Sequence, residues 1–240
     1  MDRIKFITIE TDSHSGKESK LLHSCNLNLI PIEIYGKGVK WNGFITKFQI
    51  LKNILPTLDC DIVCWTDSRD VLYMNNPSSI IEAYQTHYGK GKLVFNGETN
   101  CFPVKELAPL HPNQSKKYKY LNSGCVIGDT ELLIQLVDAC LELYETESIN
   151  DDQYLIQRML IDGKYGVAID YDCHIFQCIW DEDWGRSNNF DLMYRKDSIY
   201  NRLSGTYPLI FHAPGPTTTL SQVWKILNGN YYKKNMNYFW

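Results

Sequence analysis

The 240-residue sequence predicts an α/β fold, because two kinds of apolar pattern alternate along it. Short apolar runs such as residues 61–65 are typical of buried strands. Between them, apolar residues recur at helical spacing: Phe44, Phe48 and Leu51 lie at i, i+4 and i+7. Strands that alternate with helices place the helices against a sheet. The sequence shows no internal repeat and no domain boundary, so we expect one domain over residues 1–240. The aromatic tail after about residue 220 is a candidate C-terminal appendage of this domain.

Seven short apolar runs are predicted to form strands. They cover residues 4–10, 29–35, 61–65, 93–95, 122–128, 167–169 and 209–211. Helices are predicted over residues 17–25, 43–55 and 133–144, after Asn76-Pro77, and after residue 150. We expect Asp129 or Thr130 to cap the long helix, and Asn150 with Gln153 to form a capping box for the last one. The polar segment 181–207 is predicted to be irregular.

Charge and hydropathy argue against two classes of protein. Lys and Arg number 24 and Asp and Glu number 28, and a net charge of −4 disfavours a non-specific nucleic-acid binder, which needs a basic face. No apolar run approaches the ~18 residues of a membrane span. The N-terminus alternates like a strand rather than a secretory signal, so we expect a cytoplasmic protein or a domain cut from a longer chain. The eight cysteines form no CxxC pair, and we expect them to be reduced.

Two carboxylates directly follow the predicted strand 61–65. Asp67 and Asp70 lie just beyond its end, and ligands of open α/β sheets bind beyond the carboxyl ends of the strands. Two carboxylates there suit Mg²⁺ or Mn²⁺, which in turn binds a diphosphate. The alternative is that Asp67 caps a turn and Asp70 pairs with Arg69 or a nearby lysine. His212 follows strand 209–211 and is either a structural histidine or a third ligand, which would favour Mn²⁺.

Weaker signals come from polar residues at the ends of other elements. Asn122 opens an Asn-Ser-Gly run, whose small residues either let a ligand approach a strand closely or form a common turn. Asp151 and Asp152 begin a predicted helix, where acids also complement the helix dipole. Glu98 is a further carboxylate beyond a strand. The sequence contains no GxxxxGK[ST] phosphate loop, GxGxxG fingerprint or GxSxG elbow.

Seven runs, taken in order, resemble the glycosyltransferase domain of the procollagen lysyl hydroxylases, which are bifunctional collagen-modifying enzymes. The matching runs are FITIETD (6–12), IVCWTDSRDVLY (62–73), LVFNGETNCFP (93–103), YLNSGCVIGD (120–129), DDQ (151–153), IDYDCHIFQ (169–177) and FHAPGPT (211–217). Each run is modest alone, but together they span almost the whole chain in the order of the family. The dioxygenase signature of the family is absent, which leaves the sugar-transfer half.

The resemblance implies a GT-A fold, a Rossmann-like mixed β-sheet flanked by helices. It implies a UDP-sugar donor bound through Mn²⁺, with Mg²⁺ as the alternative. The implied reaction transfers glucose from UDP-glucose to galactosyl-hydroxylysine of a collagen-like acceptor, with retention at the anomeric carbon, and UDP-galactose is the alternative donor. The family works in the lumen of the endoplasmic reticulum, so that location is expected if the domain comes from a larger enzyme.

Residue by residue, the resemblance assigns roles to these polar positions. The implied metal ligands are Asp67, Asp70 and His212. The implied nucleotide contacts are Thr11, Lys47, Asp67, Ser68 and Gly215. Asn122, Asp151 and Asp152 match sugar- or acceptor-side positions and are our candidate catalytic residues, and Asp170 matches the acid before an Ile-Phe-Gln run.

Three departures from the family pattern bear on the donor. Ala213-Pro214 replaces a Gly-Asn after the metal histidine, which removes a polar contact to the diphosphate. Phe102 replaces a tryptophan near the sugar, and Ile50 an aromatic near the uracil. These changes leave open a catalytically weak or inactive domain that binds a UDP-sugar or collagen. A sugar nucleotidyltransferase is disfavoured, because it needs a glycine-rich N-terminal loop and residues 8–16 contain one glycine.

Overall fold

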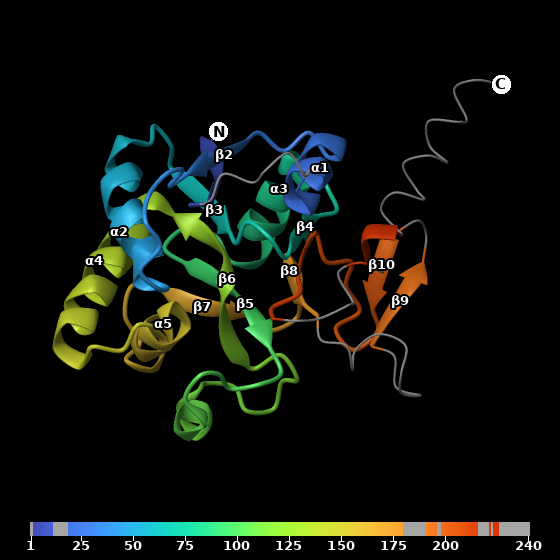
Figure 1. Cartoon of the computed structure of the whole chain (residues 1–240). Helices are drawn as coiled ribbons and strands as arrows, with labels where there is room; N and C mark the ends of the chain where they lie inside the picture. Colours follow the sequence, from blue (N-terminus) through green and yellow to red (C-terminus); the bar gives the residue numbers. More distant parts are fainter. Residues whose placement is uncertain are drawn as a thin grey trace.

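The protein is built in layers around a central six-stranded sheet (Figure 1). The computed structural model describes residues 2–11, 19–179, 191–195, 198–215, 221 and 223–225. The six strands are β1 (Ile4–Ile9), β2 (Ile32–Tyr35), β3 (Ile62–Thr66), β5 (Leu93–Glu98), β6 (Tyr120–Asp129) and β7 (Val167–Asp170). Their order is β2-β1-β3-β6-β5-β7, and β6 alone among them runs antiparallel to its neighbours. The predicted α/β class with a mixed sheet is confirmed.

Both faces of the sheet are covered by helices. The helices are α1 (Lys20–Leu27), α2 (Ile45–Ile54), α3 (Pro77–His87), α4 (Thr130–Glu147) and α5 (Asp152–Ile161), with 3₁₀ helices η1 (Leu55–Thr57) and η2 (Lys105–Leu110). α2, α4 and α5 pack on one face, and α1 and α3 on the other (Figure 1). Because successive residues of a strand point to opposite faces, Val63 and Trp65 enter one apolar cluster and Ile62 and Cys64 the other. Burial on both faces explains why β3 is apolar throughout.

The N-terminal caps of the two last helices agree with the sequence in one case and not in the other. Asp129 caps α4, since its side chain accepts two backbone N–H groups of the first turn. The capping box predicted at Asn150 is wrong: Asp151 caps α5 by accepting the Tyr154 N–H at 2.8 Å. Asn150 Oδ1 instead accepts the Ile45 N–H at 2.9 Å. Its amide therefore joins the beginnings of α2 and α5, a long-range contact that local sequence cannot show.

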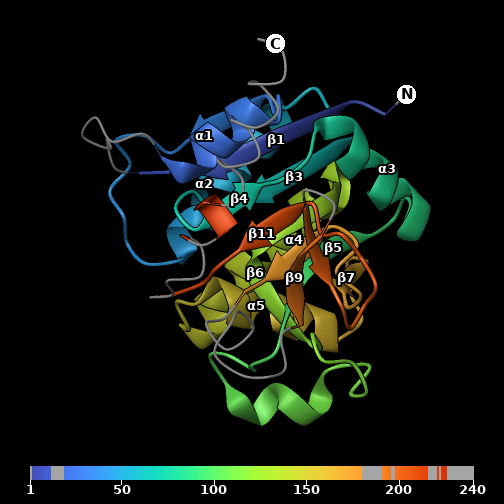
Figure 2. The same cartoon turned by 90° about the vertical axis from the view of Figure 1, so that its right-hand side faces the viewer.

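A three-stranded sheet packs into the same cluster as α1 and α3. Its strands are β4 (Val71–Tyr73), β8 (Phe176–Cys178) and β11 (Ile210–His212), in the order β4-β11-β8, and Figure 2 turns β4 and β11 toward the viewer. Only β11 was predicted, from the apolar run 209–211; β4 and β8 are too short to show a period. β9 (Leu192–Arg195) and β10 (Ser198–Asn201) pair antiparallel. The prediction that 181–207 is irregular is therefore wrong for these two strands.

The cysteines, the helix hydropathy and the chain ends bear on the remaining expectations. None of the eight cysteines is in a disulfide bond, and seven of them are buried. No helix in the described part of the chain is long and apolar enough to cross a membrane. The first helix begins at Lys20, and residues 17 and 18 of its predicted range lie outside the described residues. After residue 220 the structure describes four residues, of which Val223 is buried in a cluster with Leu72 and Phe211; the rest of the predicted appendage lies outside the described residues.

Candidate active site

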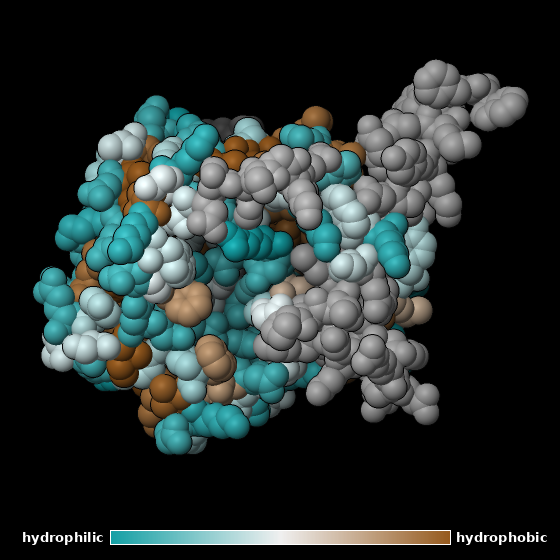
Figure 3. Space-filling view, viewed as in Figure 1, coloured by the Kyte–Doolittle hydropathy of each residue, from teal (hydrophilic) through white to brown (hydrophobic). Residues whose placement is uncertain are grey.

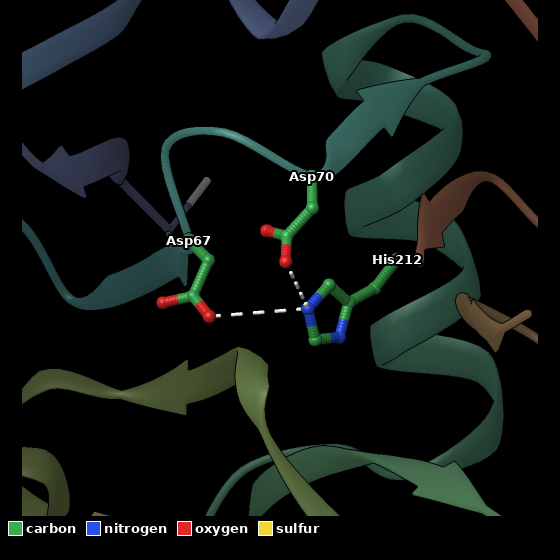
Figure 4. Close-up of side chains that lie close together, drawn as sticks. All are labelled: Asp67, Asp70 and His212. Atoms are coloured by element: carbon green, nitrogen blue, oxygen red, sulfur yellow. Dashed lines mark ion pairs between the residues drawn. The ribbon is translucent and has the colours of Figure 1, made fainter. Parts of the chain in front are cut away.

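Two acids and a histidine meet near the ends of three strands (Figure 4). Asp67 directly follows β3, and its N–H donates to the Gly124 carbonyl of β6 at 2.8 Å. Asp70 directly precedes β4. The antiparallel pairing of β4 with β11 sets His212 opposite Val71, so strand pairing brings His212 beside the two acids. The sequence placed each residue at a strand end, but the pairing that joins them was not predicted.

The three side chains converge on one point. His212 Nε2 lies 3.4 Å from Asp70 Oδ2 and 3.8 Å from Asp67 Oδ2, and one ligand atom of each lies within 4.8 Å of the others. Among the residues that the structure describes, buried His212 Nε2 has no hydrogen-bond partner. Buried polar atoms are usually paired, so this nitrogen fits a metal ligand better than a structural histidine. Two carboxylates and one imidazole suit Mn²⁺ or Mg²⁺.

Burial and mutual charge shift the pKa values of these three groups. Burial raises the pKa of the Asp67 carboxyl above its ordinary value. Burial also acts to raise the pKa of Asp70, but the neighbouring His212 outweighs it and lowers that pKa. For His212, burial acts to lower the pKa, and the Asp70 and Asp67 carboxylates raise it overall. The charge states of the three groups therefore depend on one another, as expected for ionisable groups in direct electrostatic contact.

Lys47 is a buried cation beside the same acids. Its Nζ lies 2.6 Å from Asp67 Oδ1 and 2.8 Å from Asp152 Oδ2. Burial acts to lower the pKa of Lys47, but the carboxylates of Asp152 and Asp67 raise it above its ordinary value, so the ammonium is charged at neutral pH. The positive charge of Lys47 therefore lies between two acids, Asp67 after β3 and Asp152 in the first turn of α5.

Two pockets, each of about 430 Å³, meet at these charges. Both are lined by Phe44, Lys47, Asp67 and Asp70. The first is also lined by Ile9, Glu10, Thr11, Trp41, Ser68 and Arg69. The second is also lined by Glu98, Phe102, Asn122, Ser123, Gly124, Asp151, Asp152, Gln153, His212, Pro214 and Gly215. Figure 3 shows this face hollowed, with hydrophilic side chains inside the hollow.

The predicted nucleotide contacts are divided between the two pockets. Thr11 and Ser68 line the first pocket, whereas Gly215 lines the second. Arg69, which the sequence offered as a partner for Asp70, pairs with Glu10: its Nη2 lies 2.9 Å from Glu10 Oε1. The Arg69 and Glu10 side chains thus form part of the wall of the first pocket.

The two acids at the start of α5 have different partners. Asp151 is half-buried and caps the helix, and burial raises its pKa. Asp152 is 3% exposed and pairs with Lys47. The alternative that these acids only serve the helix therefore accounts for the backbone contact of Asp151 but not for the ion pair of Asp152.

A buried polar network forms one side of the second pocket. Glu98 Oε1 accepts from Gln153 Nε2 at 2.7 Å and from Asn122 Nδ2 at 3.3 Å. Asn122 Oδ1 lies 3.0 Å from the Gly124 N–H and 2.8 Å from His212 Nδ1. Burial raises the pKa of Glu98 to about 7. Glu98 was a weak signal in the sequence, and Gln153 was expected only as a capping residue; the β5–β6 pairing and α5 bring them together.

With this geometry established, comparison with known proteins shows what the chain is similar to. The family model described as the PLOD GT domain matches residues 1–238. The chain belongs to this family. It is a glycosyltransferase domain, as the resemblance implied.

Its relatives include viral and animal proteins. It is 27% identical over 205 residues to an uncharacterized protein, R699, of Acanthamoeba polyphaga mimivirus, covering 82% of this chain and 42% of that protein. It is 27% identical over 225 residues to the multifunctional procollagen lysine hydroxylase and glycosyltransferase of Caenorhabditis elegans, covering 88% and 30%. It is 24% identical over 236 residues to human procollagen-lysine,2-oxoglutarate 5-dioxygenase 2, covering 91% and 30%. The chain thus spans between 30% and 42% of the length of these relatives.

A solved structure supports the fold. The crystal structure of a glycosyltransferase involved in the glycosylation of the major capsid of PBCV-1 superposes with a TM-score of 0.52 at 10% identity. The match covers 94% of this chain and 99% of that one. The predicted GT-A fold is confirmed.

Asp170, which matches a family acid, lines neither of the two pockets. Its fully buried carboxylate accepts the Tyr88 hydroxyl at 2.6 Å and the N–H groups of His174, Ile175 and Phe176 at 2.9, 2.7 and 2.8 Å. These bonds shape the turn between β7 and β8. Asp170 is therefore a structural acid that supports the sheet carrying His212.

The three departures from the family pattern lie in different surroundings. Pro214 and Phe102 line the second pocket, and Phe102 is 58% exposed. Ile50, a residue of α2, is buried in the core and lines neither pocket. An aromatic that the sequence analysis missed lines the first pocket instead: Trp41 is 44% exposed and contacts Phe44 edge to face at 5.9 Å.

Proposed function

We propose that this domain transfers a hexose from a UDP-sugar to a collagen-like acceptor with Mn²⁺ as cofactor, and specifically glucose from UDP-glucose to galactosyl-hydroxylysine. The observation that carries the proposal is the meeting of two pockets at Asp67, Asp70 and Lys47. Transfer of a sugar from a donor to an acceptor needs two adjoining pockets. Where they join, positive charge is needed to compensate the charge of the donor diphosphate. Family membership supports sugar transfer, and the names of the worm and human relatives support a collagen-like acceptor.

The nucleotide is assigned to the first pocket. Trp41 offers an apolar ring face for a base, and Thr11 and Ser68 offer hydroxyls for the ribose or phosphates. The diphosphate then reaches the boundary of the two pockets, where Asp67, Asp70 and His212 would hold the cation. An imidazole in the ligand set favours Mn²⁺ over Mg²⁺.

Charge at the diphosphate is the central problem of the reaction. A bound divalent cation stabilises, as a Lewis acid, the negative charge that develops on the leaving diphosphate. Lys47 adds a second positive charge, which Asp67 and Asp152 already hold in place before any ligand binds. A preorganised charge of this kind costs no rearrangement during the reaction.

The sugar and the acceptor are assigned to the second pocket. Asp151 and Asp152 both line it, and to one of these two acids we assign the role of facing the anomeric carbon or orienting the acceptor hydroxyl. Glucose and galactose differ in the configuration of one hydroxyl, so a site that hydrogen-bonds this hydroxyl discriminates strongly between the two donors. UDP-galactose is therefore the alternative donor. The same proposal includes three further points. The reaction retains the configuration at the anomeric carbon, and residues 1–240 form a single functional domain. The domain works in the endoplasmic reticulum or, if it is a stand-alone protein, in the cytoplasm.

Release of UDP tests this function directly. The purified chain is incubated with Mn²⁺, a panel of UDP-sugars and a galactosyl-hydroxylysine peptide, and UDP is measured by luminescence. We expect release to be fastest with UDP-glucose and to depend on the peptide. Asp138→Asn is a matched control, because Asp138 is a surface acid that pairs with Lys52 at 3.0 Å. Binding of UDP without any turnover would instead indicate the inactive binding domain that Pro214 leaves open.

A further inference from the structure

We infer that Asn122 and Glu98 are positioning residues for the metal ligand His212. They hold its imidazole with the proton on Nδ1, so that the lone pair of Nε2 faces Asp67 and Asp70. Asn122 then acts through His212 rather than on the substrate. The inference rests on the metal site of the proposed function and assigns it a supporting structure.

The orientation of the Asn122 amide is set from both ends. One end faces the Gly124 N–H at 3.0 Å, and a backbone N–H can only donate, so the facing atom has to be oxygen. The other end lies 3.3 Å from Glu98 Oε1, an acceptor, and has to be the NH₂ group. Asn122 is 4% exposed and Glu98 1% exposed, so both contacts are shielded from bulk water. A flipped amide would set its NH₂ group against the Gly124 N–H and its oxygen against Glu98 Oε1.

The amide orientation in turn determines the histidine tautomer. Asn122 Oδ1 lies 2.8 Å from His212 Nδ1, and an oxygen acceptor requires a proton on that nitrogen. A neutral imidazole then carries its lone pair on Nε2. Nε2 is the buried nitrogen that points at the two carboxylates, and it has no hydrogen-bond partner in the described part of the chain. Histidines that bind metals are held by a hydrogen bond from their other nitrogen in the same way.

Two further contacts keep this chain of side chains in place. A Cβ atom at Gly124 would lie 2.2 Å from His212 Cε1, so the imidazole packs directly on the backbone of β6. Gln153 Nε2 donates to Glu98 Oε1 at 2.7 Å and also to the Phe102 carbonyl at 2.8 Å. Glu98 is thus held from α5 while it holds Asn122.

Titration with Mn²⁺ alone tests the inference without any turnover. Free Mn²⁺ is measured by electron paramagnetic resonance in wild type, Asn122→Leu, Asn122→Asp and Asn96→Leu. Asn96 is a matched control, because it pairs with Asn122 across the β5–β6 register and is fully buried. Its side-chain amide makes no hydrogen bond to any residue that the structure describes. All variants are first shown to be folded by thermal unfolding.

We expect Asn122→Leu to weaken Mn²⁺ binding by about 10- to 100-fold, the usual effect of losing such a supporting contact. Mg²⁺ binding should weaken less, because imidazole contributes more to Mn²⁺. Asn122→Asp keeps an oxygen acceptor for Nδ1–H and should bind within a few-fold of wild type, as should Asn96→Leu. A shift in metal preference is a result that general loosening of the fold does not produce.

The outcomes separate this inference from the proposed function. If wild type binds Mn²⁺ and Asn122→Leu binds it equally well, the positioning role is overturned while the metal site stands. If wild type does not bind Mn²⁺, the metal site fails and the positioning role fails with it. Long-range ¹H–¹⁵N NMR spectra of the histidine rings in wild type with Mg²⁺ need no variant: a proton on Nδ1 of His212 supports the inference, and a proton on Nε2 overturns it.

Discussion

The Lys47 ammonium on α2 lies 2.8 Å from the Asp152 carboxylate at the start of α5. This ion pair joins two helices that pack on the same face of the sheet. The same nitrogen is 2.6 Å from Asp67, so one cation links the candidate metal site to the candidate sugar site. Lys47 therefore supplies a positive charge beside both acids in the absence of metal.

Lys47→Met should destabilise the metal-free protein. It leaves Asp67 and Asp152 without their cation, and breaking such a buried pair costs about 3 kcal/mol of unfolding free energy, the low end of the usual range because Asp67 is 24% exposed. Added Mn²⁺ should restore part of this loss by returning positive charge beside Asp67. Urea unfolding in EDTA and in Mn²⁺ measures both effects. Lys52→Met, on the exposed side of the same helix, serves as control, and an equal loss in the two variants would contradict the prediction.

UDP binding should require a divalent cation. Calorimetric titration of UDP in Mn²⁺ and in EDTA should show an affinity at least about tenfold weaker in EDTA, because the diphosphate would then face Asp67 and Asp70 with only the positive charge of Lys47 beside them. Asp70→Asn should weaken UDP binding in Mn²⁺, whereas Asp138→Asn should not. An affinity that EDTA leaves unchanged would remove the cation from the proposed function.

Alanine variants of Asp151 and Asp152 should separate capping from chemistry. Loss of the Asp151 cap costs about 0.5–2 kcal/mol of stability, which leaves the turnover of each folded molecule nearly intact if capping is its only role. An acid that acts on the sugar or acceptor contributes mainly in the transition state. We expect at least one variant to bind UDP and Mn²⁺ normally and to lose about a hundredfold in turnover, which corresponds to about 2.7 kcal/mol. Normal transfer by both folded variants would leave the pair with structural roles alone.

Glu98 should make stability fall as pH rises. Its pKa of about 7 lies above the ordinary 4.5, so between these values the folded state binds more protons than the unfolded state, and the free energy of unfolding decreases with increasing pH. The full effect is on the order of 3 kcal/mol. Urea unfolding of metal-free protein at about pH 5 and about pH 7.5 measures it. Glu98→Gln keeps the hydrogen-bond acceptor and removes the titration, so it should flatten this dependence; the same slope in both proteins would refute the assignment.

Local patterns in the sequence were sufficient for the sheet and its long helices. The strand β3 was predicted within one residue of its observed ends. All five of its residues are buried, and burial on both faces of the sheet requires the apolar run that the sequence shows. Helix α2 was found from its apolar period, since packing on the sheet requires one apolar face. Short β4 and β8 carry no such period, and the hairpin of β9 and β10 was hidden in a polar segment.

The sequence by itself determined the fold class and the family. It also identified Asp67, Asp70 and His212 as candidate ligands, because these residues follow apolar runs that form strands. Only the tertiary structure decided their distances, through the pairing of β4 with β11. It also decided that Lys47 joins Asp67 to Asp152 and that Asn122 contacts His212, 90 residues away. Local patterns record which residues are buried, whereas contacts between distant side chains depend on strand register and helix packing, which no short stretch of sequence contains.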